Sequence, residues 1–469
     1  MFIKKFLIVH KEQKLFDFDL SSNYNSNIEK KLFTSVLIGE NGCGKSYFLS
    51  VLADFFNEFT KRSRNFRYNE YHLIYIIDKI EYEIKVKEND TIFIKNGITV
   101  NKDQLEYPKR ILSISYTVED KFSFYNNKNN SSMYLYGGVR SSSNSTFINS
   151  SIKILIKQVA SNIFNKRFQT QLVQILEFIG YAPKMIIEYE IDNKGNDIEK
   201  FLKKRIETTY SNDYRRDKIK KILGLMSEEE LIKKCKGIIN NSHNSIEYEV
   251  DIFNPEKLLN NNIFNNLEFL DIMVLLKILK SPNIKLLKND YVSYSEASSG
   301  EKQILTTFVK IAANIKKNSL VLIDEPELSL HPKWQNQYIE KIKTIFSDSK
   351  SSHIIIATHS HFLVSDLYRG TSSLSHMKIV DHKRVILPIE YSTFGWSAEN
   401  ILYDVFEMRT SRNMYFLEEV TDLLNSIEKE NKNYILISEK REKLSKYILN
   451  EKDPLNKVLA EVDEYLNDR

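Results

Sequence analysis

A glycine-rich segment near the start of the chain has the residues needed to hold a phosphate. Gly39–Ser46 reads Gly-Glu-Asn-Gly-Cys-Gly-Lys-Ser and matches the pattern G-x-x-x-x-G-K-S, between an apolar run and a helical pattern. Such a loop points backbone amides at a phosphate, with the Lys45 ammonium reaching the outer phosphates and the Ser46 hydroxyl ligating Mg²⁺. The residues expected to contact the nucleotide are Asn41, Gly42, Cys43, Gly44, Lys45 and Ser46.

Two adjacent carboxylates follow a second apolar run far downstream. Leu320–Ile323 are four consecutive apolar residues, and Asp324 and Glu325 come directly after them. This pattern is typical of a buried parallel strand that ends at the edge of an α/β sheet where ligands bind. We expect Asp324 to hold Mg²⁺ and Glu325 to orient or deprotonate an attacking water.

Two further segments complete the set of candidate residues. Ala297–Gln303 reads Ala-Ser-Ser-Gly-Glu-Lys-Gln and precedes an apolar helical pattern, while Thr358–Ser360 follows the strand-like run Ile354–Ala357. The position of His359 at the end of a strand favours a functional role over packing. A metal site made by His359 and His361 is disfavoured, because no third ligand lies nearby in the sequence.

The order of these motifs resembles the ABC ATPases of the SMC and RecF-like branch. Asp324–Pro332, which reads Asp-Glu-Pro-Glu-Leu-Ser-Leu-His-Pro, resembles the overcoming-lysogenization-defect nucleases and related bacterial defence ATPases. The resemblance covers residues 1–60 and 290–400. It implies an α/β fold, an ABC-type P-loop ATPase head that hydrolyses ATP with Mg²⁺ at sites completed by a second copy of the chain.

The resemblance also assigns roles to individual residues. It implies that Ser298 and Gly300 bind the γ-phosphate of ATP held by the opposing subunit, that Ser329–His331 lie at the dimer seam, and that His359 is the switch histidine near the γ-phosphate. The residues of this signature are Ser298, Ser299, Gly300 and Glu301. The sequence departs from the usual Leu-Ser-Gly-Gly, since Ala297 replaces the leucine and Ser299 the first glycine. The second glycine still allows close backbone approach.

The glutamine usually found between the phosphate loop and the insertion has no obvious counterpart. Ser115–Asp120 occupies the expected place, but no residue there can be assigned from the sequence. Gln104 lies in what reads as an exposed turn.

The elements that must position these residues fall into four regions. We predict an N-terminal ATPase lobe over 1–150, a mainly helical insertion over 151–288, a C-terminal ATPase lobe over 289–400 and a helical extension over 401–469. Within the first lobe, apolar residues recur at helical spacing after Ser46. The stretch Tyr125–Ser150 is rich in Asn, Ser and Gly and is predicted to be a long loop.

Composition excludes several classes of protein. The chain has 469 residues, a formal charge of +5 and two cysteines, of which Cys43 lies in the phosphate loop. A disulfide framework is therefore not expected, and a reducing cytoplasm fits. No stretch approaches 18 uninterrupted apolar residues, so we expect no membrane partner. The small positive charge permits nucleic-acid contact without arguing for it.

Chain length narrows the kind of ATPase. The interval from Ser46 to Ala297 is too short for the coiled coil of an SMC protein, and the residues after Ser360 lack the pattern of a TOPRIM nuclease domain. The segment Ser392–Phe406 resembles the ATPases of Septu and retron–Septu antiphage systems, and the ATPase of PARIS systems is a rival. The resemblance implies a separate effector, either an HNH nuclease or a TOPRIM protein, and a phage trigger. A DNA repair or recombination ATPase is the alternative.

Overall fold

The structure is a computed structural model whose described part has two compact units. The described residues are 1–23, 31–59, 66–88, 90–117, 119–123, 133–138, 140–142, 145–146, 148–192, 199–200, 203–204, 227–240, 244–256, 263–368, 370–381, 383–408, 413–428, 433–447 and 455–467. The units are Met1–Ala398 and Glu399–Arg469.

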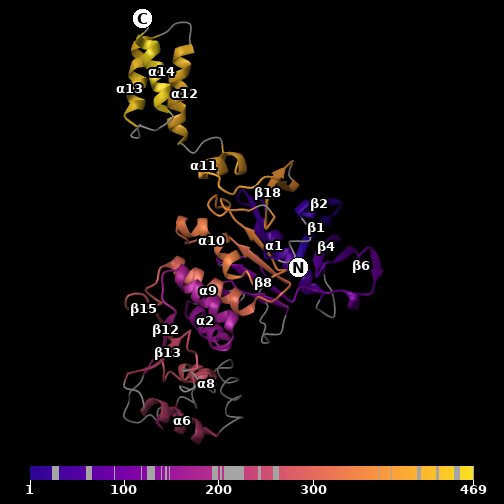
Figure 1. Ribbon diagram of the computed structural model, residues 1–469, viewed down its shortest axis with the longest axis vertical. Helices are drawn as coiled ribbons and strands as arrows, with labels where there is room; N and C mark the ends of the chain where they lie inside the picture. The colour runs from indigo at the N-terminus through magenta and orange to yellow at the C-terminus, as the bar shows by residue number, and fades with distance from the viewer. Residues whose placement is uncertain are drawn as a thin grey trace. The chain divides into compact units, whose positions relative to one another are not determined.

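A seven-stranded sheet forms the centre of the first unit (Figure 1). Its strands, in spatial order, are β19 (Lys383–Ile389), β18 (Ser372–Val380), β3 (Phe33–Gly39), β17 (His353–Ala357), β16 (Ser319–Asp324), β8 (Arg110–Ser115) and β9 (Tyr134–Tyr136). Neighbouring strands are parallel except β18 and β19. Residues in β3, β16 and β17 are buried throughout, as expected for parallel strands covered on both faces.

The register of this sheet brings the predicted motifs to one edge. Leu37 of β3 pairs with Ala357 of β17, and Ala357 pairs with Asp324 of β16. Because these strands are parallel, their C-terminal ends lie at the same edge of the sheet. The phosphate loop, the acidic pair and His359 follow those ends.

An antiparallel sheet covers helix α1 (Lys45–Glu58) on the side away from the central sheet. It contains, in spatial order, β2 (Gln13–Asp19), β1 (Phe2–His10), β4 (Glu70–Ile77), β5 (Ile80–Lys87), β6 (Asp90–Lys95) and β7 (Ile98–Val100). The predicted apolar face of α1 is buried: Phe48 packs on Phe16 and Phe18, and Phe55 packs on Tyr71. Burial of side chains of this size, about 1.5–3 kcal/mol each, fixes the helix that follows the phosphate loop.

The insertion contains a sheet that the sequence analysis missed. Its helices are α2 (Ile148–Asn162), α3 (Lys166–Phe178), α6 (Glu228–Asn240) and α8 (Ile263–Leu275), and α2 and α3 pack on α9 (Ser299–Asn314). Its antiparallel sheet has the order β13 (Ser245–Asp251), β12 (Lys184–Glu190), β14 (Asn283–Leu287) and β15 (Tyr291–Ser293). Alternate residues of β12, such as Ile187 and Tyr189, are buried, while Glu188 pairs with Lys285 on the other face. This period-two pattern signals a strand.

The prediction of an uninterrupted loop over Tyr125–Ser150 was wrong for its described residues. They form strands β9, β10 (Arg140–Ser142) and β11 (Ser145–Thr146) and the start of α2. Backbone pairing of β10 with β11 overrides the loop-like composition. Residues 125–132, 139, 143, 144 and 147 of that stretch lie outside the described part.

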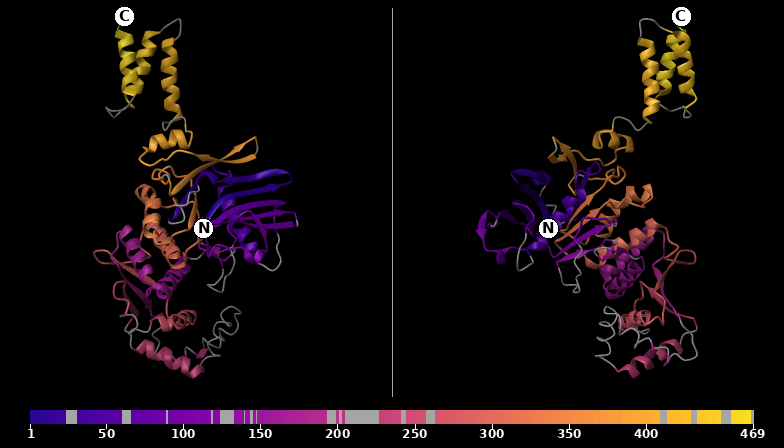
Figure 2. Two further views of the ribbon diagram at one scale, coloured as in Figure 1. Left: turned by 45° about the vertical axis from the view of Figure 1, so that its right-hand side comes forward. Right: turned by 180° about the vertical axis from the view of Figure 1, so that it is seen from behind.

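The second unit is helical. A π-helical turn (Ile401–Val405) precedes α12 (Met414–Glu428), α13 (Tyr434–Ser445) and α14 (Leu455–Asn467), which form a bundle (Figure 2). The small core of the bundle contains Leu423, Ile437, Leu444, Leu459 and Val462. Across the described residues of the whole chain, no helix is long and apolar enough to cross a membrane.

Candidate active site

The phosphate loop turns through three glycines with left-handed backbone. Gly39, Gly42 and Gly44 have φ values of 153°, 82° and 107°. A Cβ at Gly39 would lie 2.2 Å from the Met377 carbonyl oxygen of β18, whereas a Cβ at Gly42 would meet nothing within 4 Å. Glycine is therefore required at Gly39 by both conformation and packing, and at Gly42 by conformation.

Lys45 has a full set of hydrogen-bond partners without a phosphate. Its Nζ donates to the carbonyl oxygens of Gly39 at 2.9 Å and Glu40 at 3.2 Å, and to Nε2 of His359 at 2.7 Å. An ammonium has three N–H donors, so all of them are used. Burial lowers the pKa of Lys45, although the nearby Glu325 carboxylate opposes that effect. A phosphate must exchange with at least one of these three acceptors.

Asp324 is a buried carboxylate with an unused oxygen. Its side chain hydrogen-bonds the Ser46 hydroxyl, its Oδ1 has no partner, and burial raises its pKa to about 7, helped by the charge of Glu325. Mg²⁺ takes one or two carboxylates from a protein and fills its shell with phosphate oxygens and water. A buried carboxylate with an unpartnered oxygen, bonded to the Ser46 hydroxyl, is a donor set that fits this chemistry.

Glu325 and His359 face each other across the end of the sheet. Glu325 has a positive φ of 48°, its N–H donates to the Ala357 carbonyl at 2.9 Å, and its Oε1 lies 3.5 Å from His359 Nε2. Burial lowers the pKa of His359 to about 4, and the Lys45 charge acts in the same direction. The imidazole is therefore neutral near pH 7 and accepts from Lys45, so its contact with Glu325 is not an ion pair.

Glu327 is a third carboxylate that the sequence analysis did not single out. Its Oε1 accepts the backbone N–H of His359 at 2.6 Å, and burial raises its pKa. It therefore ties the segment after the acidic strand to the segment carrying the histidine. The second glutamate of the Asp-Glu-Pro-Glu run was the available signal.

A pocket of about 530 Å³ opens beside these groups. It is lined by Ser46, Thr117, Glu119, Asp120, Lys121, Asp324 and Glu325. The segment Ser115–Asp120, expected to replace the usual glutamine, thus contributes to the wall. Gln104 lies in an exposed 3₁₀ turn, Lys102–Gln104, as expected. The residue that does the glutamine's work stays unassigned.

The signature segment lies apart from this pocket. Ser298 caps helix α9: its Oγ accepts the Glu301 N–H at 3.2 Å, and a Glu301 carboxylate oxygen accepts the Ser298 N–H at 2.7 Å. A Cβ at Gly300 would lie 2.9 Å from the Ser329 carbonyl oxygen. No described residue from Ser298 to Glu301 lines the 530 Å³ pocket. The chain therefore brings together Lys45, Ser46, Asp324, Glu325 and His359, but not its own signature.

His331 has a local structural role. It precedes helix α10 (Pro332–Ile345), and its Nδ1 accepts the Lys333 N–H at 3.2 Å. A contact of Ser329–His331 with a second subunit stays a prediction.

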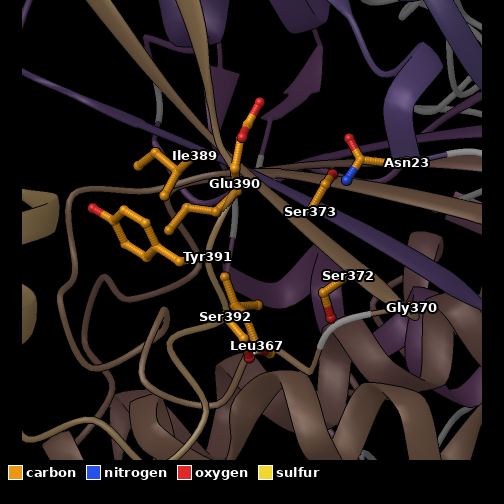
Figure 3. Close-up of a pocket in the computed structure, with 10 residues that line it drawn as sticks. Asn23, Leu367, Gly370, Ser372, Ser373, Ile389, Glu390, Tyr391 and Ser392 are labelled. Carbon is orange, nitrogen blue, oxygen red and sulfur yellow. Dashed lines mark hydrogen bonds between the residues drawn. The ribbon is translucent and has the colours of Figure 1, made fainter.

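A second pocket, of about 330 Å³, lies at the opposite ends of the parallel strands (Figure 3). Ser373, one of its lining residues, pairs with Ser35, whereas Met377, further along β18, pairs with Gly39. Its described lining is Asn23, Leu367, Gly370, Ser372, Ser373, Leu374, Ile389, Glu390, Tyr391 and Ser392. None of these described lining residues has a basic side chain.

Comparison with known families matches this architecture. The AAA ATPase domain family matches residues 12–364, which is more than half of the chain. The chain belongs to this family. Nucleotide binding is a property of such domains, and the loop, acidic pair and histidine described above lie within the matched residues or directly beside them.

Three relatives indicate the kind of system in which similar domains occur. The chain is 33% identical to the Septu protein PtuA of Bacillus thuringiensis over 142 residues, which are 30% of this chain and 34% of PtuA. It is 24% identical to the retron Vc95 probable ATPase of Vibrio cholerae over 233 residues, 45% of this chain and 41% of that protein. It is 23% identical to the endonuclease GajA of Bacillus cereus over 508 residues, 92% of this chain and 66% of GajA. The matches to PtuA and the retron ATPase thus span well under half of those proteins.

The raised pKa of Asp324 makes a prediction about stability. The pKa of Asp324 in the folded protein, about 7, lies above its value in the unfolded chain. The folded state therefore loses stability as the pH rises from about 4 to about 7, because the buried carboxyl must give up its proton. Without Mg²⁺ and nucleotide, Asp324→Asn should be more stable than the wild type at pH 8 by roughly 2–4 kcal/mol, with little difference near pH 4. Chemical denaturation across this pH range measures the difference.

The control is Asp348→Asn, which changes an exposed aspartate of the same unit. It should follow the wild-type profile at every pH. Parallel pH profiles for Asp324→Asn and the wild type would contradict the assignment of a buried, proton-binding Asp324.

Proposed function

We propose that this chain is the ATP-hydrolysing subunit of a bacterial antiphage defence complex, that it dimerises around ATP and that it controls a separate effector. The observation that carries the proposal is the convergence of Lys45, Asp324, Glu325 and His359 at one sheet edge, within a domain related to a Septu protein and a retron ATPase. The proposed setting is the cytoplasm, which fits the two free, buried cysteines.

Hydrolysis assigns a task to each residue of the site. The loop amides and Lys45 bind the phosphates, and Ser46 and Asp324 would hold Mg²⁺, which supplies charge neutralisation on the phosphate oxygens. Glu325 orients the attacking water and accepts its proton, because its carboxylate lines the pocket beside Asp324. His359 acts as a neutral hydrogen-bonding group near the outermost phosphate, since its pKa of about 4 keeps it uncharged.

A shared site explains the position of the signature. Ser298 is exposed at the N-terminus of α9, which presents backbone amides and a positive helix end, yet no described signature residue lines the chain's own nucleotide pocket. We propose that Ser298 and Gly300 bind the γ-phosphate of ATP on a second copy, as the family resemblance implies.

The effector is proposed to be another chain, an HNH nuclease or a TOPRIM protein. Nucleotide can change the affinity for that partner only if it binds the holding and releasing forms unequally. Nucleic acid or a phage protein would then act as the trigger. The likeness to the endonuclease GajA supports a second candidate, a chain that cuts nucleic acid itself, and the sequence analysis also left a repair ATPase open.

The role of Glu325 is tested by Glu325→Gln, which keeps size and polarity but removes the base. We expect ATP binding to persist and turnover to fall by roughly 10²–10⁴-fold, the usual contribution of a general base. The variant should also accumulate as an ATP-bound dimer, because the closed state is no longer resolved by hydrolysis. Phosphate release and light scattering measure the two effects.

Glu327→Gln is the matched control for this experiment. It changes a neighbouring carboxylate that holds the His359 backbone, so a smaller loss is expected. Near-normal turnover by Glu325→Gln would remove Glu325 from the role of base.

Sharing of the site is tested by mixing two inactive variants, Lys45→Ala and Ser298→Arg. If the signature acts on the opposing nucleotide, a mixed dimer has one site with both lesions and one intact site, and activity is partly recovered. If each chain uses its own signature, both sites are damaged and no activity returns. Differently tagged subunits, purified as mixed dimers, allow ATPase activity to be measured per dimer.

The regulatory role predicts that the purified chain does not cut DNA or RNA. Cleavage should be absent with Mg²⁺, Mn²⁺ and ATP, and should appear when the product of the neighbouring gene is added. Robust cleavage by the chain alone would favour the nuclease candidate and overturn the regulatory one, whether or not Asp324→Asn abolishes that cleavage. Co-purification with a repair complex instead of a nuclease would favour the repair alternative.

A further inference from the structure

A hairpin from the far end of the ATPase unit supports the back of the phosphate loop. Strands β18 and β19 follow the acidic strand and His359 in the chain, and they pair with each other antiparallel beside β3. A Cβ at Gly39 would lie 2.2 Å from the Met377 carbonyl oxygen of β18, and a Cβ at Gly44 would lie 2.8 Å from Nε of Arg384 on β19. The hairpin therefore touches the loop at both its first and its last glycine.

Arg384 makes the side-chain bond between this hairpin and the loop. Its Nε donates to the Cys43 carbonyl oxygen at 3.0 Å. Its guanidinium carbon lies 5.7 Å from the centre of the Phe16 ring, and Phe16 packs edge-on against Phe48 of α1 at 5.5 Å. The guanidinium thus lies between the Phe16 ring, on β2 of the antiparallel sheet, and the backbone of the phosphate loop.

The geometry of the peptide unit gives this bond a consequence inside the loop. In a planar trans peptide the C=O of one residue and the N–H of the next point in opposite directions. No peptide bond among the described residues is cis. Anchoring the Cys43 oxygen to Arg384 therefore aims the Gly44 N–H away from the Arg384 side chain. An amide fixed in this direction is a donor for a nucleotide phosphate.

We infer that Arg384 is a positioning residue for nucleotide binding, which orients the Gly44 amide by holding the Cys43 carbonyl from behind. Gly44 has no Cβ and a left-handed φ of 107°, so its backbone is less restricted by sterics than that of other residues, and an external anchor lowers the entropic cost of binding. Arginine suits the position because its planar side chain donates from Nε while it stacks on a ring. The inference rests on nucleotide binding by the loop and not on control of an effector.

The test is nucleotide affinity in Arg384→Met and Arg384→Lys, with Lys383→Gln as the control. Lys383 is the adjacent residue of β19, exposed and of the same charge. For Arg384→Met, which has no donor at this position, we expect the Kd of ADP and of a non-hydrolysed ATP analogue to rise by about tenfold, the effect of losing one charge-assisted hydrogen bond. KM for ATP should rise equally, with kcat at saturation close to that of the wild type. Lys383→Gln should match the wild type in every measurement.

Arg384→Lys separates orientation from charge. Lysine keeps the charge and the stem over Phe16 but has no donor at the Nε position, so most of the affinity loss should remain. Three results would each overturn the inference. Arg384→Lys could bind nucleotide as tightly as the wild type, the loss of affinity could be confined to the ATP analogue with ADP unaffected, or the Kd values could be unchanged in both variants. If Arg384→Met unfolds, as its nucleotide-free melting temperature would show, Arg384→Lys decides. All these Kd values are measured without an effector, so the outcome is independent of whether the proposed regulatory role holds.

Discussion

The site depends on the register of three buried parallel strands. Ala357 pairs with Leu37 on one side and with Asp324 on the other, so β17 and β16 end level with each other and two residues before the end of β3. Lys45 and His359, 314 residues apart in sequence, are thereby brought to 2.7 Å. A shift of one residue between these strands would separate the groups and turn buried side chains to the wrong face. The apolar side chains that fix the register therefore also fix the chemistry.

The bond between Lys45 and His359 makes nucleotide binding an exchange reaction. A phosphate that binds Lys45 competes with two loop carbonyl oxygens and with the neutral imidazole of His359. If the phosphate displaces His359 from Lys45, the imidazole still lies beside Glu325. The backbone of His359 is meanwhile held by Glu327. The main chain of His359 is thus held independently of its imidazole, as the role proposed for this residue near the outermost phosphate requires.

The sequence predicts those site residues that lie in a motif of consecutive residues. The loop around Lys45 and the carboxylates after β16 could be predicted because a glycine pattern and an apolar run are local signals. The bond from Arg384 to Cys43 could not, since it joins residues 341 apart and β19 has no local motif. The strand β12 was missed although its alternation was visible, because the helical pattern around it dominated the interpretation. The residue replacing the usual glutamine was not found for a related reason: a pocket wall depends on tertiary position.

Electrostatic cost links ligand binding to the rest of the molecule. The site holds a partly unpaired Asp324 and a Glu325 with left-handed backbone, a conformation that costs about 1 kcal/mol or more in a non-glycine residue. A ligand that supplies positive charge to Asp324 removes part of this cost and so stabilises the ATPase unit. If this unit has two conformations that differ in how closely Asp324 and Glu325 approach each other, the ligand binds more tightly to the one with the closer approach. The shape of any surface that differs between these two conformations then depends on whether nucleotide is bound, even though that surface does not contact the nucleotide. An effector bound to such a surface would be held or released according to the occupancy of the site, because the same free-energy difference governs both equilibria.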